Sequence, residues 1–265
     1  MKDLLNSNYF SGQGEIFLAK RDSTGTPGAL FMIGNAPKFE VKPTVERRKH
    51  KESRSGNRLY DKVQTVTKGG QLTITIEDIR KDNLALVLMG KKVALGSGSY
   101  SGSTYDTFPS GLIVGSIVQL AKPSASSIVV KDSAGTPATL VAGTDYEVLD
   151  AGHGLIRILN LGSYVQPFRA QYSYAATDVV TAMEANDDDE YALYFAGVNT
   201  EGTPTDQRIG FRIYRIVFDP AQLIALINDE QGSFDIQGEI LKDLTKAADA
   251  NFGGFARWDY IDANS

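Results

Sequence analysis

Short runs in which apolar and polar residues alternate recur along much of the chain, and this period of two is typical of β-strands with one buried face. The clearest runs are residues 71–76 and 234–240, and the apolar residues within 15–20 also predict a strand. In a longer run, residues 208–218, the apolar positions change parity near Tyr214 and Arg215, which predicts a β-bulge. The pattern therefore predicts a mainly β protein.

Two other stretches carry residues that typically begin and end short helices. A helix is expected from Asp78 to about Met89, with Glu77 or Asp78 as its N-terminal acid or cap and with Gly90, a residue type that commonly stops helices, after its last residue. The second stretch begins at Asp219 and Pro220, where aspartate caps a helix and proline fits its first position, and it continues to about residue 227.

Residues 37–90 read as one unit, a long β-arm followed by the first helix. An alternating strand at 39–45 leads into a charged, glycine-bearing run at 46–58, and a second extended segment covers 59–67. A turn is expected at 68–70, before the strand at 71–76. The basic residues of this arm are Lys42, Arg47, Arg48, Lys49, Lys51, Arg54, Arg58 and Lys62.

Ordering the backbone of a long arm costs conformational entropy. In a monomer, a polar arm buries too little surface to offset this cost. We therefore expect a neighbouring subunit to supply the missing contacts. Opposite charges guide two surfaces together and fix their alignment. The acidic run that includes Asp187, Asp188, Asp189 and Glu190 is therefore a candidate receiver for the arm of a neighbouring subunit.

The composition changes after Lys92. Residues 95–111 are rich in Gly, Ser and Thr, which is typical of a loop or linker, and short β segments separated by turn signals follow to about residue 176. We interpret residues 95–180 as a small inserted β-sandwich of immunoglobulin-like type. Residues 1–94 and 181–265 then form the main β domain of this 265-residue chain.

Charge and cysteine content exclude some functions. A net charge of −5 and a pI near 5.2 argue against a protein that coats nucleic acid, which would normally be basic. The absence of cysteine excludes disulfides, thiolate zinc sites and cysteine nucleophiles. The first residues have no apolar core of a signal peptide, and no apolar run approaches the ~18 residues of a membrane span, so we expect synthesis and retention in the cytosol.

No convincing catalytic motif is found. His50 lies in the charged arm and His153 between two glycines, so both are interpreted as surface residues. The acidic run at 184–190 lacks the spacing of an EF-hand. The many acidic residues leave open a carboxylate pair of the glycosidase type. We expect a protein that is not an enzyme and that carries no metal or other cofactor.

Four stretches in this order resemble the major tail tube proteins of long-tailed (siphovirus-type) bacteriophages. They are the strand at 14–19, the arm with its helix up to Gly90, the late strands joined through Phe218-Asp219-Pro220, and residues 234–242. Together they cover roughly residues 10–92 and 190–243. The stretches 143–148 and 154–158 are similar to a small β module of many phage structural proteins.

The resemblance implies a tail-tube fold, a β-sandwich or barrel with a flanking α-helix, a long β-hairpin arm and an inserted module. Such subunits form rings, usually of six, that stack into a tube through which DNA leaves the virion. The implied partners are further copies of the chain, tail proteins such as the tape measure and the terminator, and DNA that passes without specific binding. The implied location is the virion tail, assembled in the host cytoplasm, without a membrane anchor.

The resemblance also assigns roles to residues. The arm would bridge adjacent rings through Arg47, Arg48, Lys49, Lys51, Arg54 and Arg58. The lumen would be acidic, because like charge keeps phosphates from binding. Candidates for this lining, on polar strand faces, are Glu40, Asp235 and Glu239.

An alternative reading is a β-rich adhesin or carbohydrate-binding protein whose inserted module carries the site. Aromatic rings can stack on sugars, although most tyrosines serve packing. The candidate tyrosines are Tyr100, Tyr105, Tyr146 and Tyr164.

Overall fold

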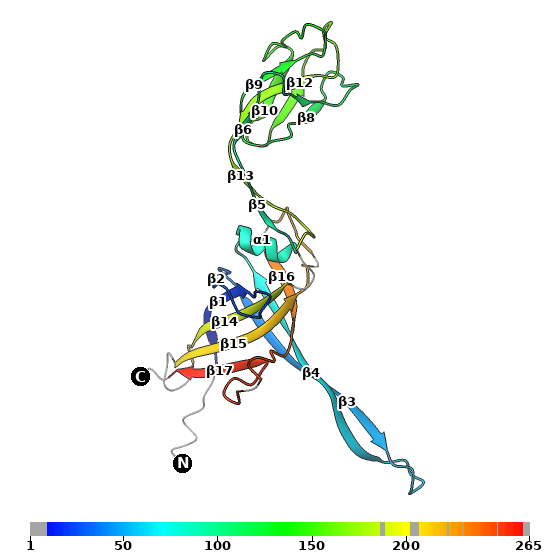
Figure 1. Ribbon diagram of the computed structural model, residues 1–265, viewed down its shortest axis with the longest axis vertical. Helices are drawn as coiled ribbons and strands as arrows, with labels where there is room; N and C mark the ends of the chain where they lie inside the picture. The colour runs from blue at the N-terminus through cyan, green and yellow to red at the C-terminus, as the bar shows by residue number, and fades with distance from the viewer. Residues whose placement is uncertain are drawn as a thin grey trace. The chain divides into compact units, whose positions relative to one another are not determined.

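The protein is mainly β, as predicted. A computed structural model (Figure 1) describes residues 10–185, 189–201, 207–221, 223–229, 231–247 and 249–261. These residues form several antiparallel sheets, none of them closed into a barrel, and one short helix. The chain splits into two compact units, Met1–Lys91 with Val180–Ser265 (unit 1) and Lys92–Val179 (unit 2).

Unit 1 is built on one antiparallel sheet of eight strands. Its order is β2-β1-β14-β15-β16-β4-β3, and β17 pairs with the part of β15 that β16 leaves free. The strands are β1 (Gly12–Lys20), β2 (Phe31–Met32), β3 (Lys38–Lys51), β4 (Tyr60–Ile76), β14 (Glu190–Asn199), β15 (Gln207–Phe218), β16 (Phe234–Ile240) and β17 (Ala256–Ile261).

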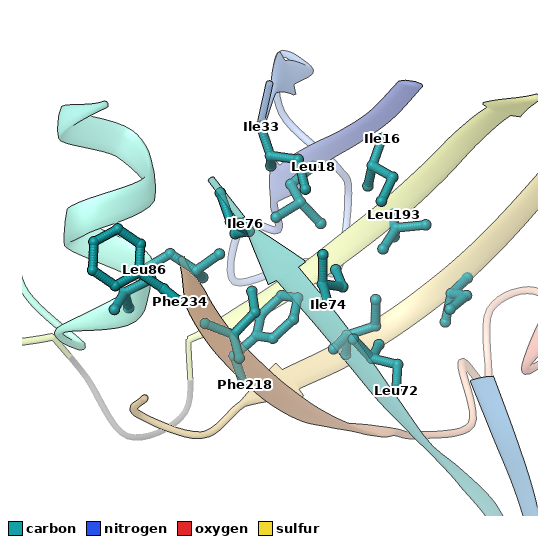
Figure 2. Close-up of a cluster of buried hydrophobic side chains, with 14 of the residues drawn as sticks. Ile16, Leu18, Ile33, Leu72, Ile74, Ile76, Leu86, Leu193, Phe218 and Phe234 are labelled. Carbon is teal, nitrogen blue, oxygen red and sulfur yellow. The ribbon is translucent and has the colours of Figure 1, made fainter. Parts of the chain in front are cut away.

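The core of unit 1 lies on one face of this sheet. Figure 2 shows Leu18 of β1, Ile74 of β4 and Phe234 of β16 in a single cluster of buried side chains. The Phe39 ring of β3 lies 5.7 Å from the Phe195 ring of β14, centroid to centroid, although three strands separate β3 from β14 in the sheet. The sheet therefore curves enough for distant strands to share one core, which buries apolar surface from both of its halves.

The helix α1 (Lys81–Val87) packs on this core through Leu86 and Val87. It is shorter than predicted, and neither Glu77 nor Asp78 caps it: the N-cap position is Arg80, without a side-chain cap. The main-chain oxygen of Asp78 instead accepts a hydrogen bond from the buried Asn83 side chain.

The second predicted helix is wrong for the described residues of 219–227, which follow an irregular path after β15. The N–H of Ala221 donates to the carbonyl of Val87, 2.9 Å away, and not to a helical partner. A helix of about two turns is unstable without a surface to pack on. Most apolar side chains of this stretch are exposed.

The turn predicted at 68–70 is also wrong, because Lys68, Gly69 and Gly70 lie inside the continuous strand β4. Gly70 is paired on both sides, with Pro43 and Ile240, and a Cβ at Gly70 would lie 3.2 Å from the Ile240 side chain. Because glycine has no side chain, it allows the three strands to lie close together at this position.

The predicted bulge in β15 is confirmed. Tyr191 of β14 pairs with Ile216 and Leu193 with Ile213, so two residues of β15 oppose one residue of β14. The extra residue lets Ile213 and Ile216 both point into the core, as the change of parity required.

Unit 2 contains two small sheets that enclose one core. One has the order β10-β11-β8, the other is β6-β12-β7 with β9 beside β12, and the buried Phe168 and Ile156 lie between them. The strands are β6 (Gly98–Tyr100), β7 (Asp106–Thr107), β8 (Ile117–Gln119), β9 (Ala125–Lys131), β10 (Tyr146–Asp150), β11 (Leu155–Ile158) and β12 (Arg169–Tyr174).

The chain enters this unit through β5 (Lys92–Leu95) and leaves it through β13 (Thr177–Val180), which pair with each other. The stretch 95–111 is not only a linker, because β6 and β7 lie in it and pair with β12. Tyr100 in this stretch packs against the core of unit 2. The short strand was not predicted because the stretch is rich in serine and glycine, which are typical of loops. The immunoglobulin-like type of the module stays a prediction.

Asp145 organises a turn of unit 2, and its removal gives a testable prediction. Its buried carboxylate accepts hydrogen bonds from the Val141 N–H (2.8 Å), the Asn160 amide (3.0 Å) and the Tyr164 hydroxyl (2.8 Å). Asp145→Ala leaves three donors without an acceptor, which destabilises a folded domain. We expect the melting temperature of unit 2 to fall by several degrees in calorimetry.

The single tryptophan, Trp258, lies in unit 1 and provides the control. Its fluorescence transition should be the same in Asp145→Ala and in the unaltered protein. Equal calorimetric traces for the two proteins would contradict the role of Asp145.

Candidate self-association site: the β3–β4 arm

The arm is a two-stranded ribbon that continues β3 and β4 beyond the sheet (Figure 1). The next strand, β16, pairs with β4 only from Gly70 to Ile76. From the pair of Thr44 and Gly69 outward to the last pair, Lys51 with Tyr60, the two strands have only each other as sheet partners among the described strands.

Both faces of the ribbon are open to solvent. Every residue from 42 to 68 is exposed except Glu52, which is half-buried. A two-stranded hairpin without a packed face is marginally stable in water at best. The arm nevertheless has large apolar side chains with no partner in the core, namely Val45, Leu59, Tyr60, Val63 and Val66.

The tip of the arm is ordered by hydrogen bonds. The Glu52 carboxylate accepts from the Arg54 N–H (2.7 Å) and from both the N–H and the hydroxyl of Ser55. The hydrogen bonds from Ser55 are the main reason why the pKa of Glu52 is lowered. The Glu52 N–H itself donates to the Leu59 carbonyl, which closes the loop.

The two faces of the arm differ in chemistry. Side chains alternate along a strand, so every second residue from Phe39 lies on the face that continues the buried side of the sheet. The pairing shifts register at two places, where Val66 and Asp61 of β4 have no opposite residue on β3. Regular pairing resumes beyond each of these residues. We call this the basic–apolar face; in the arm it carries Val45, Arg47, Lys49 and Lys51 of β3 and Tyr60, Val63, Thr65 and Lys68 of β4.

The structure thus separates the six basic residues proposed as arm contacts. Arg47, Lys49 and Lys51 share the basic–apolar face, and the ammonium groups of Lys49 and Lys51 both lie 5.4 Å from the centre of the Tyr60 ring. Arg48 lies on the opposite face, and the remaining two, Arg54 and Arg58, lie in the tip loop.

The arm and the rest of the chain have opposite charge. Residues 42–68 contain nine basic and three acidic residues, a net charge of +6 at neutral pH. The whole chain carries −5, so the other residues carry −11, from 18 basic and 29 acidic residues. Opposite charge on two surfaces of one chain is a property that can steer association between copies.

Two of the four residues of the candidate acidic receiver, Asp187 and Asp188, lie outside the described residues. Asp189 forms an ion pair with Lys20 of its own chain, with 2.6 Å between Nζ and Oδ2. This pairing leaves less of its charge for another subunit. The role of the acidic run as a receiver stays a prediction.

Glu190, the fourth receiver residue, belongs to an ion-pair network. Its Oε1 lies 2.5 Å from Arg215 Nη2, and its Oε2 lies 3.6 Å from Arg21 Nε. Arg21 is buried, donates to the carbonyl of Tyr214, and pairs with the buried Asp243 at 3.0 Å. This network links the end of β1 to the segment that follows β16.

The three candidate lumen residues come together on one exposed face of the sheet, opposite the core. Glu40 of β3 and Asp235 and Glu239 of β16 point to this side, with β4 between them. Lys38 and Lys42 of β3 share the face, and Lys38 lies 3.1 Å from Glu40. The face is therefore mixed in charge within one subunit.

The tyrosines proposed for sugar stacking are engaged in packing. Tyr146 is buried, and Tyr164 donates its hydroxyl to Asp145. Tyr100 packs against two neighbouring tyrosine rings, and the Tyr105 ring has an arginine guanidinium 5.4 Å from its centre. This arrangement gives no free aromatic platform at these four positions.

Both histidines form exposed pairs with aspartate. His50 lies 2.7 Å from Asp61 in the arm, and His153 lies 2.6 Å from Asp150. The hydrogen bond from each histidine lowers the pKa of its aspartate. No cluster of three or more potential metal-binding side chains occurs within the part of the chain that the structure describes.

Comparison with known proteins gives a family but no activity. No curated protein matches the chain. Among the described residues, no helix has the length and apolar character that crossing a bilayer requires. Residues 9–259 match the model of a family described as "Protein of unknown function UCP028589". Because the match extends over nearly the whole sequence, the chain belongs to this family.

Proposed function

We propose that the protein is a structural subunit of a bacteriophage tail tube, in which rings of the chain, hexameric by the resemblance, stack into a conduit for DNA. The observation that carries the proposal is the β3–β4 arm. It presents apolar and basic side chains on a ribbon that has no core of its own.

The energetics of the arm favour association with a second copy. Exposed apolar groups gain free energy when they are buried, at roughly 25 cal/mol per Å². The body of a second copy carries −11 and attracts the +6 of the arm. The arm is thus suited to join copies of one chain end to end, as the resemblance implies for stacked rings.

The conduit function concerns the sheet face that carries Glu40, Asp235 and Glu239. Repeated around a ring, acidic groups raise the negative potential along a channel and keep phosphates from binding. Lys38 and Lys42 offset part of this charge in each subunit. Three acidic and two basic side chains leave this face with a net charge of −1 for each subunit, so the lining of the proposed tube stays negative.

The proposal gives the protein no enzymatic role and no cofactor. It places the protein in the virion tail after assembly in the host cytoplasm, in contact with other tail proteins and with DNA. A carbohydrate-binding role for unit 2 gains no support from the four packed tyrosines described above.

The proposal predicts association that depends on concentration and salt. In sedimentation velocity, the purified full-length chain should shift from a monomer to large assemblies as its concentration rises. Salt should weaken this shift, because the Debye length falls from ~10 Å at 0.1 M to ~3 Å at 1 M. A strictly monomeric protein at high concentration and at every ionic strength would count against the proposal.

A further inference from the structure

A groove lies where the chain passes from β15 to β16. Its volume is about 670 Å³, and its lining includes Leu223, Asn228, Asp229, Asp235 and Gln237. The two aspartates are exposed, and none of the described lining residues is basic. We call it the β15–β16 groove.

The segment beside the groove exposes large apolar side chains. Leu223 is 76% exposed, Leu226 89% and Ile227 95%. Apolar side chains gathered at one place on a surface, with polar groups around them, mark interaction sites. The groove thus combines negative charge with apolar surface.

The basic–apolar face of the arm has the complementary combination. Arg47, Lys49 and Lys51 supply positive charge, and Val63 and Tyr60 supply exposed apolar surface. We propose that the β15–β16 groove of one subunit receives the basic–apolar face of the arm of a second copy. This inference rests on the proposed function and names the receiver, in place of the acidic run at 184–190.

The arm of the same subunit cannot fill this groove. Asp235 in the groove pairs with Thr75 of β4 and accepts its hydroxyl hydrogen bond at 2.6 Å. Tyr60, where the arm ends, lies fifteen residues earlier on the same strand. At a rise of ~3.3 Å per residue, these positions are about 50 Å apart, at opposite ends of β4.

The placement also allows head-to-tail assembly. When a copy gives its arm to one neighbour and receives the arm of another, the contact repeats from copy to copy and forms closed rings or open stacks. Reciprocal exchange of arms between two copies would stop at a two-fold dimer, which sedimentation velocity distinguishes by its size. The Asp235 carboxylate, placed among the lumen candidates above, would then lie in an interface between copies.

The test uses full-length variants in sedimentation velocity. The donor variant is Arg47→Glu/Lys49→Glu, and the receiver variant is Asp229→Lys/Asp235→Lys. Like charges brought together across an interface cost several kcal/mol, so each variant alone should associate at least ~100-fold more weakly than the unaltered protein. Circular dichroism checks that both variants are folded.

Mixing the two variants gives the decisive result. The donor variant keeps an intact groove, the receiver variant keeps an intact arm, and the substituted arm and groove again have opposite charge. The two variants should therefore assemble with each other in alternation, at a one-to-one ratio, although neither associates alone. A chain with all four substitutions has exchanged its charges and should regain assembly.

Matched controls change as much charge elsewhere. Arg208→Glu/Lys242→Glu alters exposed basic residues outside the arm, and Glu15→Lys/Glu201→Lys alters exposed acidic residues outside the groove lining. Both controls should associate within about threefold of the unaltered protein, since distant exposed charges contribute little.

The outcomes separate this inference from the proposed function. If the receiver variant assembles normally and the donor variant does not, the arm has another receiver, and the inference is overturned while the proposed function stands. If both variants assemble normally, the inference fails together with the role of the arm. If the unaltered protein does not associate, the proposed function fails.

Discussion

Reversal of Arg47 and Arg48 to glutamate is expected to abolish assembly of the protein without unfolding it. The double change lowers the charge of the arm from +6 to +2, because each substitution removes a positive charge and adds a negative one. Unfavourable charge contacts across an interface cost several kcal/mol, and ~1.4 kcal/mol is tenfold in affinity. We expect association at least ~100-fold weaker in sedimentation velocity.

The fold should not change, because both arginines are exposed and lie far from the buried cluster of unit 1. The far-ultraviolet circular dichroism and the Trp258 transition should match those of the unaltered protein. Arg208→Glu/Lys242→Glu makes the same charge change at exposed positions outside the arm and serves as the control. Normal assembly of the Arg47/Arg48 variant would reject the role of the arm.

Replacement of Arg21 by methionine should cause the largest loss of stability in unit 1. Arg21 is buried and pairs with Asp243, which is buried as well. Removal of one partner of a buried ion pair leaves an uncompensated charge and costs ~3–5 kcal/mol. The free energy of unfolding, measured with denaturant and Trp258 fluorescence, should fall by about that amount.

Acid should reduce the difference between this variant and the unaltered protein. Burial acts to raise the pKa of Asp243, but hydrogen bonds from Thr245 and Arg21 outweigh it, and the pKa is lowered. The stability that Asp243 contributes is therefore present above the ordinary aspartate pKa of about 4 and is lost as the pH falls through its lower folded value. The effect of Arg21→Met should accordingly shrink below pH ~4.

Lys20→Met is the control for this prediction. Lys20 precedes Arg21 on the chain and pairs with Asp189, but its side chain is exposed. Exposed ion pairs contribute ~0–1 kcal/mol, so a small effect is expected. Equal effects of the two substitutions, or an Arg21→Met effect that does not depend on pH, would contradict the account of the buried pair.

Alternation of apolar and polar residues could predict most of unit 1. It located β16 and the inner part of β4, and it revealed the bulge in β15, because burial on one face of a sheet imposes a period of two. The same reasoning placed a turn at Gly69 and Gly70. Glycine allows both a turn and a close approach of strands, and the sequence does not distinguish them.

The candidate site was only partly predictable. The sequence shows that the arm is charged and that few of its residues can be buried. It does not show which face of the ribbon carries Arg47 and which carries Arg48, because this depends on the register between β3 and β4. The β15–β16 groove was missed because residues 219–227 were predicted as a helix. The run of apolar residues at 223–227 was a signal that could have pointed to an interface.

Electron microscopy of the purified full-length protein would show whether copies of the chain assemble through the arm. We expect rings or stacked tubes with a central channel, in which density for the arm of one subunit lies on the next copy. Single monomers at high protein concentration, with the arm folded back onto its own sheet, would contradict this expectation.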